Sequence, residues 1–255
     1  MTKSLLITYG EVVTCEKIPT SGSSGGDCDF LWGSVKMRRG DRQGDMLDVV
    51  FSIDTTNSMS PCLNIIRQRV QEMITFLQAR FPAVRIGVVA QGDYSSRNYI
   101  TKELDLTNNT AELCEFVRSV EPTYGIDASE CYELVLHKVQ GFSWATGSQR
   151  ILVFFGDSLP HKSDYRLNKD HIDWRIETDN LSKMGIKVLA VQCSEAREKV
   201  TKFFHALALR TDGLHIHWQD SARTFRCLAG LLEGAGASVF ENLPILQTSI
   251  LSTKK

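Results

Sequence analysis

The chain has 255 residues, of which 42% are hydrophobic and 23% charged, and this ordinary globular composition excludes a polypeptide that is disordered throughout. Its formal net charge of −1 creates no overall field that would attract nucleic acid, so we expect no nucleic-acid partner. No run of about 18 apolar residues occurs, so we also expect no membrane span.

Cysteine occurs at positions 15, 28, 62, 114, 131, 193 and 227. An odd number without close pairs argues against a disulfide framework and against a zinc site built from Cys-x-x-Cys pairs. Reduced thiols are typical of a cytosolic protein. We therefore expect a cytoplasmic location.

Residues 1–45 differ in composition from the rest of the chain. Residues 5–14 could form one or two short strands, and residues 19–27 are rich in Ser and Gly, as is typical of a flexible loop. We interpret 1–45 as an N-terminal appendage to a main domain at 46–233. The pattern weakens after that, and 234–255 is expected to be a C-terminal tail.

In the main domain, short apolar segments alternate with segments in which apolar residues recur at helical spacing. Strands are expected at Leu47–Ile53, Val84–Ala90, Tyr99–Leu106, Ile151–Phe155, Ile186–Val191 and Leu214–Trp218, with Tyr99–Leu106 at an edge of the sheet. Helices are expected from Pro61 to Phe81 and at Thr110–Val120, Ser129–Val139, Asp173–Met184, Ala196–Leu209 and Ser221–Leu232.

This alternation predicts an α/β fold with a doubly wound, mostly parallel, Rossmann-like open sheet and helices on both of its faces. Ligands bind at the carboxyl ends of the strands in such sheets. Asp54, Asp93 and Asp157 each follow one of the expected core strands. We expect these three acidic loops to converge at one edge of the sheet.

The first of these loops has the pattern Asp-x-Thr-x-Ser, formed by Asp54, Thr56 and Ser58, and a helix that starts near Pro61 follows. The pattern places one carboxylate and two neutral hydroxyls around a single point. Hard divalent cations such as Mg²⁺ accept oxygen ligands of this kind. Alternatively, Thr56 and Ser58 could cap the helix, but capping explains neither Asp54 nor Asp157.

The run resembles the metal-ion-dependent adhesion site of von Willebrand factor type A domains, in which an aspartate from a later strand end completes the ligand set. The resemblance implies that Asp54, Thr56, Ser58 and Asp157 hold Mg²⁺, or Mn²⁺ or Ca²⁺. The family's second loop supplies a threonine, where this chain has Ile126. Ile126 cannot bind a metal, and Asp127 could replace the threonine directly or through water.

The loops at 92–94 and 156–161 are similar to those of intracellular type A domains, such as those attached to atypical kinases. The resemblance implies a module that binds proteins in a metal-dependent way and is not an enzyme. The partner is expected to offer an acidic residue to the metal. We expect Asp93 to support the ligands from behind and His161 to contact a partner, although Asp93 could be an exposed turn residue and a backbone group could satisfy His161.

Two alternatives remain from the sequence. The first is a Mg²⁺-dependent phosphatase of the haloacid dehalogenase type with Asp54 as its nucleophile, although the second aspartate of that motif is replaced by Thr56. The second is a type A scaffold without metal, in which Ile126 marks a lost site. The sequence does not define the oligomeric state.

Overall fold

The computed structural model describes residues 5–8, 11–14, 46–194, 197–218 and 220–235. Contacts divide the chain into two compact units, 1–41 and 42–255. The first unit contains an antiparallel pair of strands, β1 (Leu5–Thr8) and β2 (Glu11–Thr14). The expected Ser- and Gly-rich loop at 19–27 lies outside the described residues, as does the C-terminal tail from residue 236.

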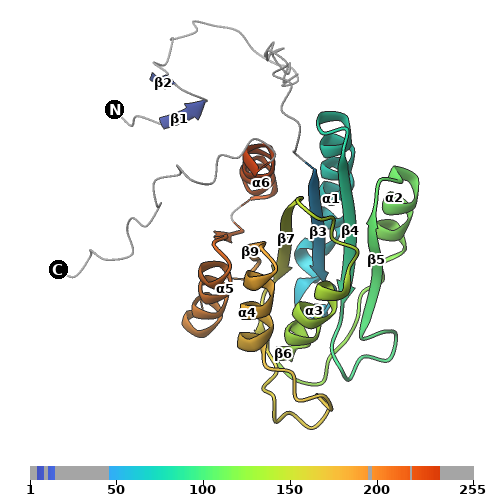
Figure 1. Cartoon of the computed structure of the whole chain (residues 1–255). Coiled ribbons are helices and arrows are strands. Elements are labelled where there is room, and N and C mark those ends of the chain that lie inside the picture. The colour runs from blue at the N-terminus through green and yellow to red at the C-terminus, as the bar shows by residue number, and fades with distance from the viewer. Residues whose placement is uncertain (1–4, 9–10, 15–45, 195–196, 219, 236–255) are drawn as a thin grey trace, which may run out of the picture. The chain divides into compact units, whose positions relative to one another are not determined.

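The second unit is built on a six-stranded sheet with the order β10-β9-β7-β3-β4-β5 (Figure 1). Its strands are β3 (Leu47–Asp54), β4 (Val84–Gln91), β5 (Thr101–Thr107), β7 (Gln149–Gly156), β9 (Ile186–Gln192) and β10 (Leu214–His217). All neighbouring pairs are parallel except β4 and β5, which are antiparallel and place β5 at an edge. The mostly parallel sheet confirms the predicted fold class.

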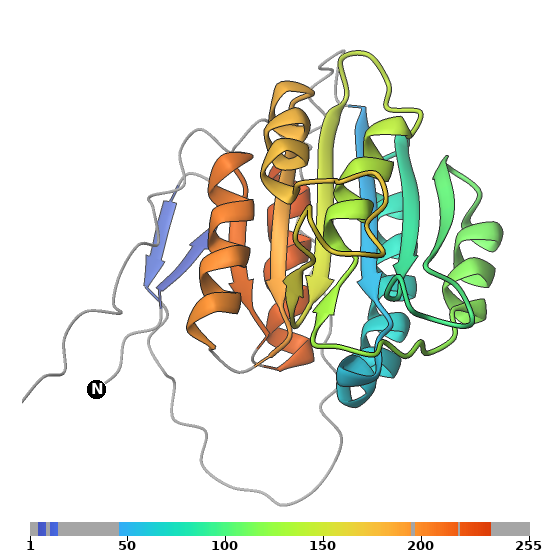
Figure 2. The same ribbon diagram turned by 90° about the horizontal axis from the view of Figure 1, so that it is seen from below.

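Helices cover both faces of this sheet (Figure 2). They are α1 (Ser60–Arg80), α2 (Thr110–Ser119), α3 (Tyr132–Lys138), α4 (Trp174–Lys183), α5 (Glu198–Arg210) and α6 (Ser221–Ala235). The apolar cluster on one face includes side chains of α1, α2 and α6, and the cluster on the other face includes side chains of α3, α4 and α5. Among the described residues, no helix is long and apolar enough to cross a membrane.

Strand β3 lies in the middle of the sheet and is fully buried along its length. Successive side chains of a strand point to opposite faces. Leu47, Val49, Phe51 and Ile53 belong to the cluster of α1, α2 and α6, so the even-numbered positions face α3, α4 and α5. Two aspartates, Asp48 and Asp54, therefore lie on the same face at opposite ends of the strand.

The expected helix at Ser129–Val139 is shorter than predicted. Residues Ser129–Glu130 form a short strand, β6, which pairs in parallel with β8 (Leu159–Pro160), and the helix starts only at Tyr132. The carbonyl of Glu130 accepts a hydrogen bond from the backbone N–H of His161 at 3.2 Å. Local helical spacing continued through this segment, but pairing with the loop after β7 overrides it.

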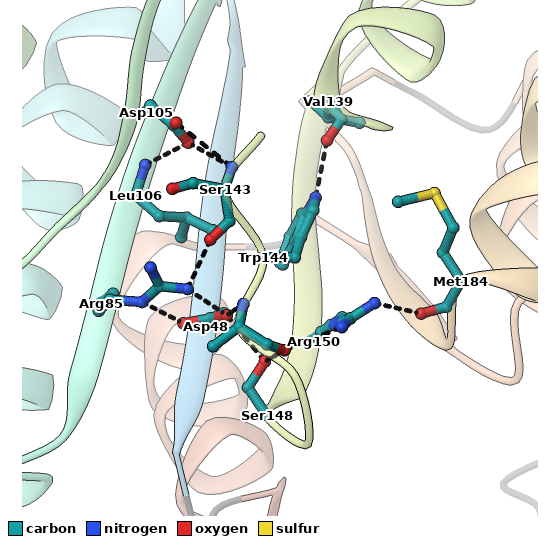
Figure 3. A network of polar contacts seen from close by, with 11 residues as sticks. Asp48, Arg85, Asp105, Leu106, Val139, Ser143, Trp144, Ser148, Arg150 and Met184 are labelled. Carbon is teal, nitrogen blue, oxygen red and sulfur yellow. Dashed lines mark hydrogen bonds and ion pairs between the residues drawn. The ribbon is translucent and has the colours of Figure 1, made fainter. Parts of the chain in front are cut away.

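Asp48 anchors the opposite end of β3 through a network of polar contacts (Figure 3). Its buried carboxylate accepts hydrogen bonds from Nε and Nη2 of Arg85 at 3.0 and 2.8 Å. The backbone N–H of Ala145 and the hydroxyl of Ser148 also donate to it, each at 2.7 Å. The network ties the loop before β7 to β3 and β4, and every hydrogen bond it supplies compensates for the burial of the charge.

We expect Arg85→Ala to destabilise the domain by about 2–4 kcal/mol, because it leaves the buried carboxylate of Asp48 without its counter-charge. Urea unfolding measures the change. Arg80→Ala is the matched control, since Arg80 and Glu233 form an exposed pair at 3.2 Å that contributes at most about 1 kcal/mol. Equal losses in the two variants would contradict the assignment.

Candidate metal-binding site

Asp54 is the last residue of β3 and its side chain is fully buried. Its Oδ1 accepts hydrogen bonds from the backbone N–H of Thr56 at 2.8 Å and from the hydroxyl of Thr56 at 2.6 Å. These two bonds close a tight loop over the end of the strand. They fix the Thr56 hydroxyl oxygen next to the carboxylate, as the Asp-x-Thr spacing predicts.

The hydroxyl of Tyr132 connects the ends of β3 and β7. It donates to Oδ2 of Asp54 at 2.5 Å and accepts from the backbone N–H groups of Asp157 and Ser158 at 3.0 and 3.2 Å. Tyr132 is fully buried, and a Cβ at Gly156 would overlap its hydroxyl. The two acidic loops are therefore held together by one side chain from α3.

Ser58 reaches the later loop directly. Its hydroxyl donates to Oδ1 of Asp157 at 3.1 Å, across 99 residues of sequence, and lies 3.3 Å from the hydroxyl of Thr56. Neither Thr56 nor Ser58 caps a helix, because no side chain caps α1 or the 3₁₀ turn at Asn57–Met59 that precedes it. The capping interpretation is therefore wrong.

These side chains line one pocket of about 270 Å³ at the carboxyl ends of the strands. Three of the predicted ligands, Thr56, Ser58 and Asp157, line it directly, and Asp54 lies beneath Thr56. Asp127 lines it as well. The other lining residues are Asn57, Gly125, Ala128, Glu130, Ser158 and Arg197. We call this the acidic pocket.

Glu130 is a pocket residue that sequence reasoning missed. It is only 5% exposed, and its Oε2 has no hydrogen-bond partner within the described part of the chain. Burial, together with the charges of Asp54 and Asp93, raises the pKa of Glu130 to about 10. The helical spacing assigned Glu130 to an ordinary helix, and no local signal marked the short strand that turns it inward.

The carboxyl groups in the pocket oppose one another's ionisation. Burial and the charge of Asp157 raise the pKa of Asp54 to about 7. Burial also raises the pKa of Asp157, although its hydrogen bond from Ser58 and the charge of Arg197 act in the opposite direction. Arg197 is the one cationic side chain among the lining residues, and its Nη2 donates to the backbone carbonyl of Asp157 at 2.5 Å.

Asp127 stands on the outer side of the pocket. Its Oδ1 accepts from the backbone N–H of Ser129 at 3.1 Å, and its Oδ2 accepts from the hydroxyl of Tyr165 at 2.9 Å. Its side chain is 38% exposed, so it can face water or a ligand in the pocket. Ile126 beside it is 68% exposed and supplies no ligand atom.

Asp93 does not line the pocket but supports it from behind. It is fully buried, so the exposed-turn alternative is wrong. Its Oδ1 lies 2.6 Å from Nε2 of His161, and its Oδ2 accepts from Ser95. Burial alone would raise the pKa of Asp93, but these hydrogen bonds hold it below its ordinary value. Gly125 packs directly against Asp93, which places the Asp127 loop.

His161 is also buried, at 4% exposed, and its ring stacks on Tyr165 with centroids 3.8 Å apart. Its backbone N–H donates to Oε2 of Glu133 at 3.0 Å, and its ring pairs with Asp93. The ring is therefore satisfied by the carboxylate of Asp93 and not by a backbone group. His161 holds Asp93 in place behind the acidic pocket, and its contact with a partner stays a prediction.

The donor set matches a hard cation. Within the described residues, no group of three or more His, Cys, Asp and Glu side chains is arranged to hold a metal ion by itself. The four predicted ligands, Asp54, Thr56, Ser58 and Asp157, instead combine two carboxylates with two hydroxyls, and Mg²⁺ commonly completes such a set with water. Burial and neighbouring carboxylates raise the pKa values of Glu130 and Asp54, and a cation in the pocket would stabilise the ionised forms of both groups.

Comparison with known proteins identifies the class of domain to which this fold belongs. The family model of the von Willebrand factor type A domain matches residues 49–159, which contain both acidic loops. The fold and this match agree, and the chain contains a von Willebrand factor type A domain. Domains of this family typically mediate protein interactions, and many bind a divalent cation at the metal-ion-dependent adhesion site.

A similar curated protein is the alpha-protein kinase vwkA of Dictyostelium discoideum, which is 21% identical over 131 residues. That match covers 51% of this chain and only 21% of the kinase, so the chain spans about a fifth of its relative.

Solved structures of other proteins share the fold. BatB of Bacteroides thetaiotaomicron is 11% identical with a TM-score of 0.55, over 75% of this chain and 99% of BatB. The pilus adhesin SpaC of Lactobacillus rhamnosus GG is 12% identical with a TM-score of 0.58, over 78% of this chain and 31% of SpaC.

We expect Tyr132→Phe to destabilise the domain by about 2–4 kcal/mol, because it removes the donor to Asp54 and leaves two buried backbone N–H groups unpaired. Thermal and urea unfolding measure the loss. Tyr165→Phe is the control: it keeps the ring stacked on His161 and removes only a partly exposed hydrogen bond, so it should cost less than about 1 kcal/mol. A Tyr132 variant as stable as the control would show that the hydroxyl does not hold the two loops.

Proposed function

We propose that this domain binds a divalent cation, Mg²⁺ or Mn²⁺, through Asp54, Thr56, Ser58 and Asp157, and uses it to bind an acidic residue of a protein partner. The observation that carries the proposal is the hydrogen bond between Ser58 and Asp157 at 3.1 Å. It joins the loop that carries Asp54, Thr56 and Ser58 to the loop that carries Asp157. The bond also accounts for the spacing of the motif, which helix capping does not.

The chemistry of the ligands suits attachment to a partner. Two of the four ligands are neutral hydroxyls, which leave much of the charge of a bound cation unneutralised. A bound cation would supply a positive, partly hydrated position that a partner's carboxylate can enter. Exposed Ile126 and Tyr124, which are 68% and 62% exposed, lie in the loop that lines the pocket and offer apolar area to the same partner.

We propose that the chain is a binding module and not an enzyme. A phosphatase of the haloacid dehalogenase type needs a second carboxylate as its general acid, and Thr56 stands at that position. The type A family and the adhesin SpaC among the similar structures support a binding role. We also propose a cytoplasmic location, in keeping with the free thiols of Cys62, Cys114, Cys131, Cys193 and Cys227.

We expect Mn²⁺ and Mg²⁺ to bind the wild-type chain at one site and to raise its melting temperature. Asp157→Asn should weaken binding by at least about tenfold, because it removes a charged ligand. Isothermal titration calorimetry measures the affinity, and thermal melting in EDTA tests the fold of the variant. Asp170→Asn removes an exposed carboxylate outside the pocket and is the matched control.

If the wild type binds neither metal while its fold is intact, the site is lost and the alternative of a metal-free scaffold holds. If both variants bind as the wild type does, the metal lies elsewhere. If Asp157→Asn alone loses binding, the pocket is the site.

Arg197 provides a separate test of the partner carboxylate. In Arg197→Ala the loss of a nearby positive charge should tighten Mn²⁺ binding about threefold. The same change should weaken binding of acetate to the Mn²⁺-loaded protein, because Arg197 lines the pocket and can share the carboxylate. Calorimetry gives the metal affinity, and water-proton relaxation of bound Mn²⁺ follows the acetate.

Opposite changes in the two affinities are the expected result, and Arg197→Lys, which keeps the charge, should change the metal affinity least. A parallel loss of metal and acetate binding would mean that Arg197 acts only by holding the carbonyl of Asp157.

A further inference from the structure

A second cleft has a volume of about 550 Å³. Some of its lining residues directly follow, in the sequence, residues that line the acidic pocket. Asp157 and Ser158 line the acidic pocket, and residues 159–164 line the cleft. Its other walls come from the first turn of α4, at 173–175, and from α5, at 199–206. We call it the basic cleft. Nothing in the metal-binding proposal uses it.

The rim of the basic cleft carries an excess of positive charge. Four exposed cations line it: Lys162, Arg175, Lys199 and Lys202. Two carboxylates, Asp164 and Asp173, are the opposing charges among the lining residues. Lys202 forms an exposed pair with Glu198 at 2.6 Å. Within the described part of the chain, neither Lys162 nor Lys199 lies in an ion pair, so both ammonium groups are available to an anion.

The floor of the cleft is apolar. Phe203 is 4% exposed and packs against Trp174. The two rings meet edge to face, with their centroids 5.0 Å apart. The guanidinium of Arg175 lies over the indole at 4.8 Å from its centroid. An aliphatic side chain of a ligand can contact this floor while charged residues beside it in the ligand contact the rim.

Two features argue against a nucleotide or a phosphate group as the ligand. The N-terminus of α4 is already capped, because Oδ1 of Asp173 accepts from the backbone N–H of Arg175 at 2.8 Å. Arg175 covers one face of the indole of Trp174, which reduces the aromatic surface on which a base could stack. Separate, flexible lysines on two elements instead match carboxylates spaced along a chain.

We propose that the basic cleft binds an acidic peptide segment in which an aliphatic residue is flanked by Glu or Asp. The aliphatic side chain occupies the floor formed by Trp174 and Phe203. The flanking carboxylates pair with Lys162 on one wall and Lys199 on the other. This interaction needs no metal, so its test is independent of the test of the proposed function.

The test uses a fluorescein-labelled peptide, Glu-Asp-Glu-Leu-Glu-Asp-Glu, and the full chain in EDTA, with binding followed by fluorescence anisotropy. We expect saturable binding that weakens as salt rises from about 0.05 to about 0.5 M. Lys162→Glu/Lys199→Glu should weaken it by about tenfold. Replacing the central Leu of the peptide by Ala should weaken it too, because the apolar contact is lost.

Lys169→Glu/Lys183→Glu is the matched control, with the same change in net charge at exposed lysines that do not line the cleft. Thermal melting shows that both double variants fold. Equal loss of binding in the two double variants would reduce the effect to the overall charge and overturn the proposal. So would the absence of saturable binding up to about 1 mM protein, or indifference to the central Leu.

Discussion

The acidic pocket depends on the hydroxyl of Tyr132, which is buried between two strand ends. One oxygen atom donates to Asp54 and accepts from the backbone N–H groups of Asp157 and Ser158. A side chain at position 156 would occupy the same space, so the glycine there is required by the close approach of the tyrosine. The geometry of both acidic loops therefore follows from the start of α3, an element that contributes no predicted ligand.

The sequence was sufficient for most of the fold because its apolar segments are long and alternate clearly. β3 and β7 were predicted to within two residues at each end, since buried parallel strands are nearly continuous apolar runs. The same pattern placed Asp54 and Asp157 at one edge of the sheet. The predicted start of α3 was wrong. The pairing of β6 with β8 joins segments about 30 residues apart, so no local pattern in the sequence indicates it. Glu130 and the support of the pocket by Tyr132 were missed for that reason.

Both aspartates of β3 are buried, and the burial of their carboxyl groups is compensated in two different ways. Asp48 has a permanent counter-charge in Arg85, with further donors from the loop before β7. Asp54 receives hydrogen bonds from Thr56 and Tyr132 but no side-chain cation within the described residues, and the pKa of its carboxyl rises to about 7. One end of the strand is therefore a finished structural contact. At the other end, the proposed cation would supply the counter-charge that Asp54 lacks.

The antiparallel edge strand β5 also bears on how the domain meets other chains. An exposed edge presents unpaired backbone groups, and a second chain can extend the sheet there and start aggregation. β5 carries Lys102, Glu103 and Asp105 along its short length, and Glu103 is held at 2.5 Å by Lys138 of α3. Charged side chains at this edge oppose the addition of another strand. The charges therefore protect β5 against the strand addition by which one copy of the chain would extend the sheet of another.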